Sequence, residues 1–240
     1  MKIAWLVQSD NFKLLKKQEN EIKEFADLFT YNWKIGNKDP YQNTSIAPDL
    51  SWSVGRSKLY EFAQNQSEYD YFVFIDDDVV MNDNQTFSNF IAYIKDNYGD
   101  TNIDLFTISS GCWQEWFIRK LGFRKDCNIF CTDLQFQMIS NKLCKDVFPV
   151  AFDGGWGTLW YPMFVTAKRG NYTRNIREFS ITNTNSNPTY NYGGVENQNS
   201  SDIWRRSEKF MPKRSKLLGR LLGFKRTIWY LNLYTSMVRK

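Results

Sequence analysis

Short apolar runs alternate with polar, charged segments along the first half of the chain. The strongest run is Tyr71-Phe72-Val73-Phe74-Ile75, and Ile3 to Val7 forms another near the start. Runs of this length, rich in β-favouring residues, are typical of strands buried inside a sheet. Between them, apolar residues near helical spacing predict a helix: Leu14, Leu15, Ile22, Phe25, Ala26 and Phe29.

The same pattern predicts further elements of both kinds. Helices are expected from Ser53 to Ala63, over residues 87–98, over residues 141–148, and from Trp160 to Ala167. Strands are expected over residues 103–109 and 128–139. The polar segments 34–48 and 171–199 are interpreted as loops, the second of them long and mobile. Strands that alternate with helices indicate an α/β fold with a doubly wound sheet.

Three consecutive aspartates, Asp76, Asp77 and Asp78, directly follow the strongest strand. Asp disfavours strand interiors, and adjacent carboxylates repel one another unless a cation lies among them. Hard cations such as Mg²⁺ and Mn²⁺ prefer carboxylate oxygens and complete their shell with phosphates and water. Strand alternation would place Asp76 and Asp78 on the same side, where both could bind one ion. An acidic turn that lies in water is the plain alternative.

The segment Phe74-Ile75-Asp76-Asp77-Asp78-Val79 resembles the DxD motif of GT-A-fold glycosyltransferases. The resemblance implies that one acid, Asp76 or Asp77, contacts the ribose of a nucleotide-sugar donor. It also implies that the last acid binds the metal on the diphosphate.

The same resemblance extends upstream of the aspartates. It implies that Val7, Ser9 and Asp10, at the exit of the first strand, hold the base and the ribose. It further implies that Arg56 or Lys58 approaches the nucleotide. A solvated helix face is the alternative for these two basic residues.

Downstream, the segment from Phe148 to Trp160 resembles a Gly-Trp-Gly segment found in a subgroup of these enzymes. That segment contributes an acid and the walls of the acceptor site. Leu159 stands where the subgroup often has an acid, so Asp153 is the predicted general base. A turn residue is the alternative for Asp153. Trp156 and Trp160 are the predicted acceptor-site walls.

Two further residues complete the candidate site. Asp133 is a second candidate acid near the acceptor, with a structural role as the alternative. Many relatives place a histidine metal ligand near the start of the late loop, but this chain contains no histidine. Asn183 stands in that stretch and is the predicted substitute ligand, through its carbonyl oxygen.

Composition limits the class of protein. The 240 residues suit one α/β domain with an appendage. Aromatic residues make up 17%, a high share, and they either pack cores or stack on sugars. Four cysteines without histidine leave no zinc-site pattern. The first apolar run is too short for a signal peptide, and no segment approaches the ~20 apolar residues of a membrane span. The chain is therefore expected to be cytoplasmic.

The chain has a net charge of +5, and much of the excess of basic residues lies after Trp204. There, an apolar series at helical spacing has basic residues on a neighbouring face, which predicts a basic amphipathic helix: Leu217, Leu221, Phe224, Ile228 and Leu231, with Lys213, Lys216 and Arg220. We expect residues 1–203 to form the transferase domain and residues 204–240 to bind an anionic membrane on its inner face. Docking on a protein or on the domain itself is the alternative. Nucleic acid is not expected, because no recognition fold is evident.

Taken together, these features predict a GT-A (Rossmann-like) mixed central sheet flanked by helices, with a basic C-terminal tail. The predicted activity is metal-dependent transfer of a sugar from a nucleoside-diphosphate donor, a UDP-sugar first, to a hydroxyl of a glycan or lipid-linked acceptor. Mn²⁺ or Mg²⁺ is the predicted cofactor. A haloacid-dehalogenase-like phosphatase is one alternative, although its Asp-x-Asp motif normally lies on the first strand. A degenerate transferase fold that serves as a membrane-bound scaffold is the other.

Overall fold

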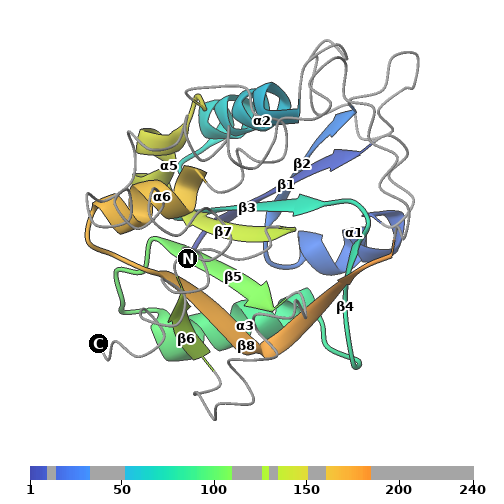
Figure 1. Ribbon diagram of the computed structural model, residues 1–240. Coiled ribbons are helices and arrows are strands. Elements are labelled where there is room, and N and C mark those ends of the chain that lie inside the picture. Colours follow the sequence, from blue (N-terminus) through green and yellow to red (C-terminus); the bar gives the residue numbers. More distant parts are fainter. Residues whose placement is uncertain (10–14, 33–51, 110–125, 130–134, 151–160, 185–240) are drawn as a thin grey trace.

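The computed structural model describes residues 1–9, 15–32, 52–109, 126–129, 135–150 and 161–184 (Figure 1). Its strands are β1 (Ile3–Ser9), β2 (Asp27–Asn32), β3 (Tyr71–Asp76), β4 (Val79–Met81), β5 (Leu105–Ser109), β6 (Asp126–Ile129), β7 (Phe136–Ser140) and β8 (Thr173–Asn183). Its helices are α1 (Leu15–Lys23), α2 (Trp52–Gln66), α3 (Phe87–Tyr98), α5 (Asn141–Val147) and α6 (Tyr161–Lys168).

The strands form one mixed sheet in the order β2-β1-β3-β7-β5-β8-β4, with β6 also paired to β8. Strands β2, β1 and β3 run parallel to one another, whereas β7 is antiparallel to both β3 and β5. β8 is the longest described strand. It pairs with β5 and β6 in its first part and with β4 near its end. The predicted mixed central sheet is thus confirmed.

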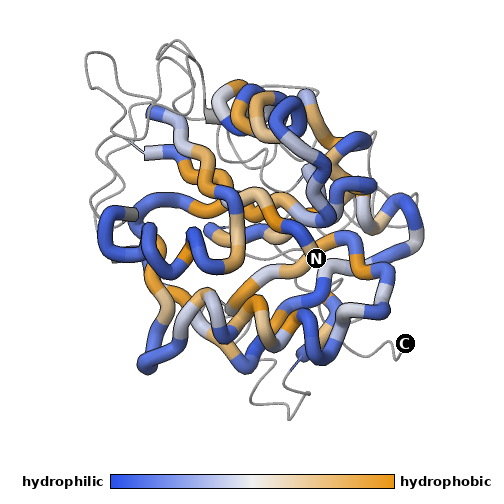
Figure 2. Tube along the Cα trace, turned by 180° about the vertical axis from the view of Figure 1, so that it is seen from behind, coloured by the Kyte–Doolittle hydropathy of each residue, from blue (hydrophilic) through white to orange (hydrophobic). Residues whose placement is uncertain are grey.

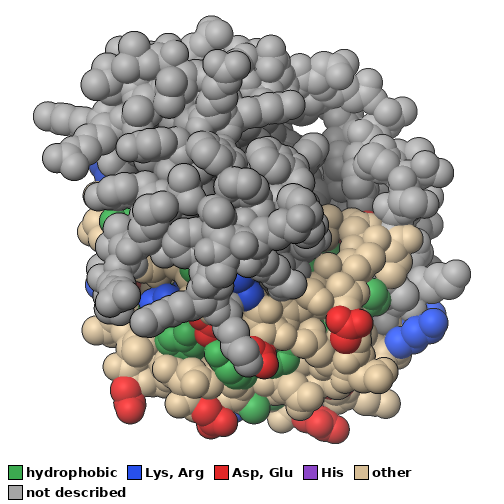
Figure 3. All heavy atoms as spheres, turned by 60° about the horizontal axis from the view of Figure 1, so that its bottom comes forward, with side chains coloured by type: hydrophobic (Ala, Val, Ile, Leu, Met, Phe, Trp, Pro, Cys, Tyr) green, Lys and Arg blue, Asp and Glu red, His purple; other side chains and the backbone are tan. Residues whose placement is uncertain are grey.

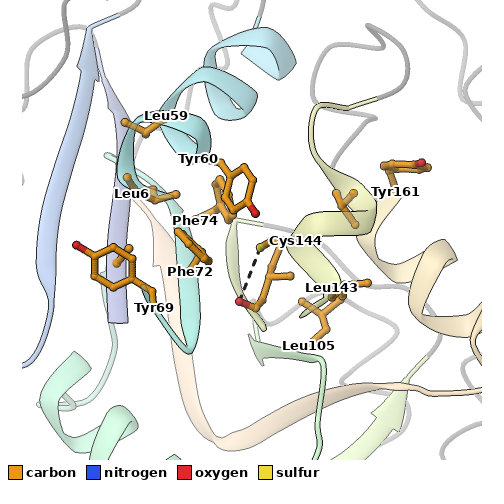
Figure 4. Close-up of a cluster of buried hydrophobic side chains, with 14 of the residues drawn as sticks. Leu6, Leu59, Tyr60, Tyr69, Phe72, Phe74, Leu105, Leu143, Cys144 and Tyr161 are labelled. Carbon is orange, nitrogen blue, oxygen red and sulfur yellow. Dashed lines mark hydrogen bonds between the residues drawn. The ribbon is translucent and has the colours of Figure 1, made fainter. Parts of the chain in front are cut away.

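Helices cover both faces of this sheet, which explains the unbroken apolar runs of its central strands. Leu6, Phe72 and Phe74 pack under α2, α5 and α6 (Figure 4). Trp5 and Val73, their neighbours in sequence, face the opposite side, which α1 and α3 cover. Because successive strand side chains alternate between faces, a strand buried on both faces must be apolar throughout. Figure 2 shows this contrast between the apolar strands and the more hydrophilic chain around them.

The aromatic residues of the described chain serve mainly as core. Trp5 is fully buried, and its ring meets Phe25, Phe87 and Phe136 edge-on, with centroids 5.5, 5.0 and 5.9 Å away. On the other face, Phe148 stacks on Phe74 at 5.0 Å. These edge and offset contacts are the arrangements that aromatic quadrupoles favour. Ring contacts of this kind pack both faces of the sheet on which the strand ends lie.

The predicted helix through Phe29 is wrong in its second half. α1 ends at Lys23, where the amide of Ala26 bonds to the carbonyl of Ile22 at 2.9 Å, and residues 27–32 form β2. The side chains from Leu28 to Tyr31 suit a strand, and parallel pairing with β1 satisfies the backbone. Pairing within the sheet therefore overrides the helical spacing of the apolar residues.

Two other boundaries also differ from the sequence prediction. The single strand expected over residues 128–139 is two strands, β6 and β7, which lie in different parts of the sheet. The loop expected over residues 171–199 is a strand up to Asn183, and residues 185–199 lie outside the described part. Polar composition misled here, because β8 buries polar side chains such as Thr173 and Asn175 between paired neighbours.

The helices over residues 53–63, 87–98 and 141–148 are confirmed as α2, α3 and α5. The last predicted helix is present as α6, which begins at Tyr161. The segment 34–48 and the tail 204–240 lie outside the described residues. Within the part that the structure describes, no helix has the length and apolar character needed to cross a membrane.

Candidate active site at the carboxyl ends of β1 and β3

The three aspartates lie where β3 ends, beside the end of its parallel neighbour β1. Gln8 of β1 is in register with Asp76 of β3, so Ser9 and Asp77 leave the two strands at the same edge of the sheet. Ligands of open α/β sheets bind at this edge, because parallel strands bring their carboxyl ends together there. The site is therefore built on two central strands with buried side chains on both faces.

Asp76 is held by a buried arginine from α2. Arg56 Nη2 donates to Asp76 Oδ1 at 3.1 Å, and Nη1 donates to Gln137 Oε1 of β7 at 3.3 Å. The guanidinium carbon also lies 5.3 Å from the centre of the Phe74 ring. The Arg56 side chain is only 5% exposed and that of Asp76 is 23% exposed. A buried arginine needs such partners, because it cannot lose its charge.

Asp77 is held by the first strand. The Ser9 hydroxyl donates a hydrogen bond to Asp77 Oδ2, which joins the exits of β1 and β3. Ser9 is fully buried. A predicted nucleotide-binding residue and an acid of the cluster are therefore in direct contact.

Asp78 is held by the end of β8. Its carbonyl oxygen accepts a bond from the Thr184 amide at 2.7 Å and another from the Thr184 hydroxyl at 3.0 Å. Asn183 pairs with Val79 in the β4–β8 ladder, one step from this contact. Opposed residues of a ladder share one face of the sheet, so Asn183 projects on the face of Val79. Asp78 as a residue is 8% exposed.

The strand-alternation argument for Asp76 and Asp78 does not hold. β3 ends at Asp76, and Asp77 and Asp78 form the turn that leads into β4. Each aspartate is instead held by a different element: α2, β1 and β8. The chain turns after Asp76 so that β4 can pair with β8, about a hundred residues further along the chain. The local sequence carries no sign of this pairing.

The structure brings six predicted site residues into this region: Ser9, Arg56, Asp76, Asp77, Asp78 and Asn183. Val7 lies just before them, with its side chain in the core beneath α1 and α3. Lys58 does not join them, because its side chain is half exposed and pairs with Glu61 at 3.2 Å on the surface of α2. Asp10, Asp133, Asp153, Trp156 and Trp160 lie outside the described residues.

Sequence reasoning missed three groups that shape the site: Gln137, Thr184 and the backbone at Gly55. A Cβ at Gly55 would lie 2.3 Å from Gln8 Nε2 and 2.6 Å from the Tyr31 ring. Glycine therefore lets α2 press against β1 and β2, which brings the adjacent Arg56 to Asp76. In the sequence, the glycine directly before Arg56 was the available sign of this close packing. Gln137 and Thr184 carried no such sign, since their partners are distant in sequence.

The donor set fits a hard cation. Within the described ranges, no three Asp, Glu, Cys or His side chains converge into a ready-made metal cage. Mg²⁺ and Mn²⁺ do not require one, since they bind through one or two carboxylates and take further oxygens from substrate phosphates and water. Arg56 and Ser9 bond to oxygens of Asp76 and Asp77. Asp78 is the acid that the resemblance to the DxD motif assigns to such an ion.

Comparison with known proteins gives a match at the level of structure. No protein-family model matches the sequence, and no curated protein matches it. A mannosyltransferase from Pyrobaculum calidifontis, solved with GDP-Man and Mn²⁺, has a TM-score of 0.61 at 11% identity, covering 98% of this chain and 72% of its own. Glucosyl-3-phosphoglycerate synthase from Mycobacterium tuberculosis, solved with Mg²⁺ and UDP, has a TM-score of 0.56 at 12% identity, covering 89% and 81%. The chain has the GT-A fold.

A third solved structure, TarS from S. aureus, agrees with this assignment. Its TM-score is 0.53 at 14% identity, covering 96% of this chain and 78% of its own. At such low identities the likeness shows the fold and nothing finer. The predicted GT-A architecture is therefore confirmed, and the argument for activity depends on the residues of the site.

Proposed function

We propose that this GT-A-fold protein is a metal-dependent glycosyltransferase that uses a nucleoside-diphosphate sugar as donor. The observation that carries the proposal is the aspartate cluster at the carboxyl ends of β1 and β3, with each acid held by a separate element. Such restraint suits binding of a divalent cation and of the donor's hydroxyl groups, because the acids need no reorganisation when these arrive.

In this proposal, Asp78 holds the divalent ion, with Asn183 as the next candidate ligand. When bound, the ion would neutralise negative charge that develops on the leaving diphosphate. Asp76 and Asp77 would accept hydrogen bonds from the donor's hydroxyl groups, and Arg56 and Ser9 keep these two carboxylates in place. The acceptor is a hydroxyl of a glycan or lipid-linked molecule. Asp153 is the proposed base that takes its proton, and Asp133, Trp156 and Trp160 are proposed to contact the acceptor.

The experiment that tests this proposal measures thermal unfolding against a panel of nucleoside diphosphates, with and without Mn²⁺. UDP and GDP come first, since two of the solved structures named above contain UDP or GDP-Man. A ligand that binds only the folded state at ~100 times its dissociation constant adds about 2.7 kcal/mol of stability. The expected result is a shift with one nucleotide that requires metal and is lost in Asp78→Asn.

Asp83→Asn is the matched control. Asp83 is an exposed carboxylate in the loop after β4, five residues from Asp78, and its φ of 56° suits asparagine equally well. This variant should keep the full shift. If no nucleotide shifts the unfolding midpoint of the wild-type protein, the transferase proposal fails.

A scaffold without activity is the second candidate, and one observation favours it. The chain contains no histidine, whereas many members of the family that it resembles use one as a metal ligand near the start of the late loop. A scaffold of this kind should show no metal-dependent affinity for any nucleotide. The phosphatase alternative is not favoured, because Asp76 ends the third strand in chain order and Asp78 follows it, whereas the phosphatase motif normally lies on the first strand.

We further propose that the protein works at the cytoplasmic face of a membrane, through the basic segment 204–240. The face of the described chain shown in Figure 3 carries scattered Asp and Glu side chains together with a few Lys and Arg side chains. A face of mixed charge has no concentrated positive patch to attract anionic lipid. In contrast, each Lys or Arg of segment 204–240 that comes near an anionic membrane surface would gain about 1 kcal/mol. Co-sedimentation with anionic vesicles should depend on this segment, and a chain ending at residue 203 should stay in the supernatant.

A further inference from the structure

Thr184 makes two hydrogen bonds to the backbone of Asp78. Its amide and its hydroxyl both donate to the Asp78 carbonyl, at 2.7 and 3.0 Å. Val79 pairs with Asn183 in the β4–β8 ladder, so this contact lies one step beyond the last paired residues. We call this double contact the Thr184 clamp.

The clamp acts at a point that the sheet itself holds weakly. β4 has three residues and forms the end of the sheet order, and Asp78 lies in the turn between β3 and β4. Terminal positions of short ladders open readily. The Thr184 hydroxyl donates a second hydrogen bond to the carbonyl that already accepts one from the Thr184 amide. Together the two bonds hold the main chain of Asp78, which carries the proposed metal-binding carboxylate.

We propose that Thr184 is a positioning residue for the metal site: through the clamp it sets the affinity of Asp78 for the divalent ion. This inference rests on the proposed function. Groups that orient metal ligands strongly affect metal affinity, typically by about 10–100-fold. The effect on Mn²⁺ affinity here should be smaller, about three- to tenfold, because the hydrogen bond from the Thr184 amide to Asp78 remains when the hydroxyl is lost.

The test compares Thr184→Val, which keeps the shape but removes the hydroxyl, with Thr184→Ser, which keeps the hydroxyl. The loss of the aqueous Mn²⁺ signal in electron paramagnetic resonance gives the Mn²⁺ dissociation constant directly, without turnover. Titrations are made with saturating UDP or GDP, whichever stabilises the wild-type protein, and the signal that the nucleotide alone removes is taken from a titration without protein. We expect a rise of about three- to tenfold in the dissociation constant for the valine variant and less than about twofold for the serine variant.

Thr101 provides a matched control with the same geometry. Its amide and its hydroxyl both donate to the Tyr98 carbonyl, at 3.0 and 2.7 Å, in the exposed turn after α3. Thr101→Val loses an equivalent hydrogen bond far along the chain from the aspartates and should leave the Mn²⁺ dissociation constant unchanged.

Each outcome decides the proposal. If Thr184→Val binds Mn²⁺ as the wild type does, or if Thr184→Ser is weakened as much as the valine variant, the clamp does not set metal affinity, while the proposed function still stands. If Thr101→Val weakens Mn²⁺ binding equally, the effect is general destabilisation and the proposal is overturned. A wild-type protein that binds no Mn²⁺ with any nucleotide would overturn both the clamp's role and the proposed function.

Discussion

The buried ion pair between Arg56 and Asp76 predicts a large, non-additive effect on folding stability. Replacement of Arg56 by Met removes the cation and leaves a carboxylate next to Asp77 and Asp78. Removal of one partner of a fully buried pair costs about 3–5 kcal/mol. The Asp76 side chain is 23% exposed, so water can partly solvate it, and we expect about 2–3 kcal/mol.

Loss of the other partner, in Asp76→Asn, should cost about 3 kcal/mol of folding stability. Arg56 is only 5% exposed and cannot lose its proton, so its buried charge would be left unpaired. The double variant Arg56→Met/Asp76→Asn removes both charges and leaves no isolated ion. Its cost should be about 1–2 kcal/mol, well below the sum of the two single costs. The two substitutions are therefore expected to be coupled, with the double variant more stable than the sum of the single costs predicts.

Urea unfolding followed by circular dichroism measures these free energies at equilibrium. Lys58→Met is the matched control on the same helix, since Lys58 forms only an exposed pair with Glu61. It should cost less than about 0.5 kcal/mol. The reasoning is refuted if Arg56→Met costs no more than Lys58→Met, or if the double variant costs the sum of the single variants.

Two further predictions concern α2. Gly55→Ala should destabilise the protein by about 1 kcal/mol, because the clash of its Cβ with Gln8 and Tyr31 outweighs the better helix propensity of alanine. A gain of stability in urea unfolding would contradict this. Tyr60→Phe should stabilise the protein by up to about 1 kcal/mol at pH 7, since the buried Tyr60 hydroxyl has no hydrogen-bond partner among the described residues. Burial, and then Cys144, raise the pKa of Tyr60 to about 12. Above pH 10 the unfolded chain loses this proton while the folded chain keeps it, so stability falls as the pH rises toward 12. The Phe variant should lose less stability between pH 7 and 10.5 than the wild type, and an equal loss would contradict the assignment.

The sequence determined the elements whose signals are local. The run from Tyr71 to Ile75 could be assigned to a central strand because apolar β-favouring residues on both faces suit only a covered strand. The carboxylates after it indicated the edge where the site lies, and residues 87–98 carried a helical pattern, which the structure shows as α3. Resemblance to the DxD motif then led to the GT-A fold, which the structure confirms.

Only the tertiary structure decided how the aspartates are held. The Arg56–Gln137 and Asp78–Thr184 contacts join residues 81 and 106 positions apart, and no local spacing encodes such partners. The residues after Lys23 could continue a helix by spacing, and parallel pairing with β1 made them a strand. β8 similarly carries polar residues that suit a loop in isolation. In each case backbone hydrogen bonds to a distant strand outweighed the local preference, because a buried backbone group must find a partner.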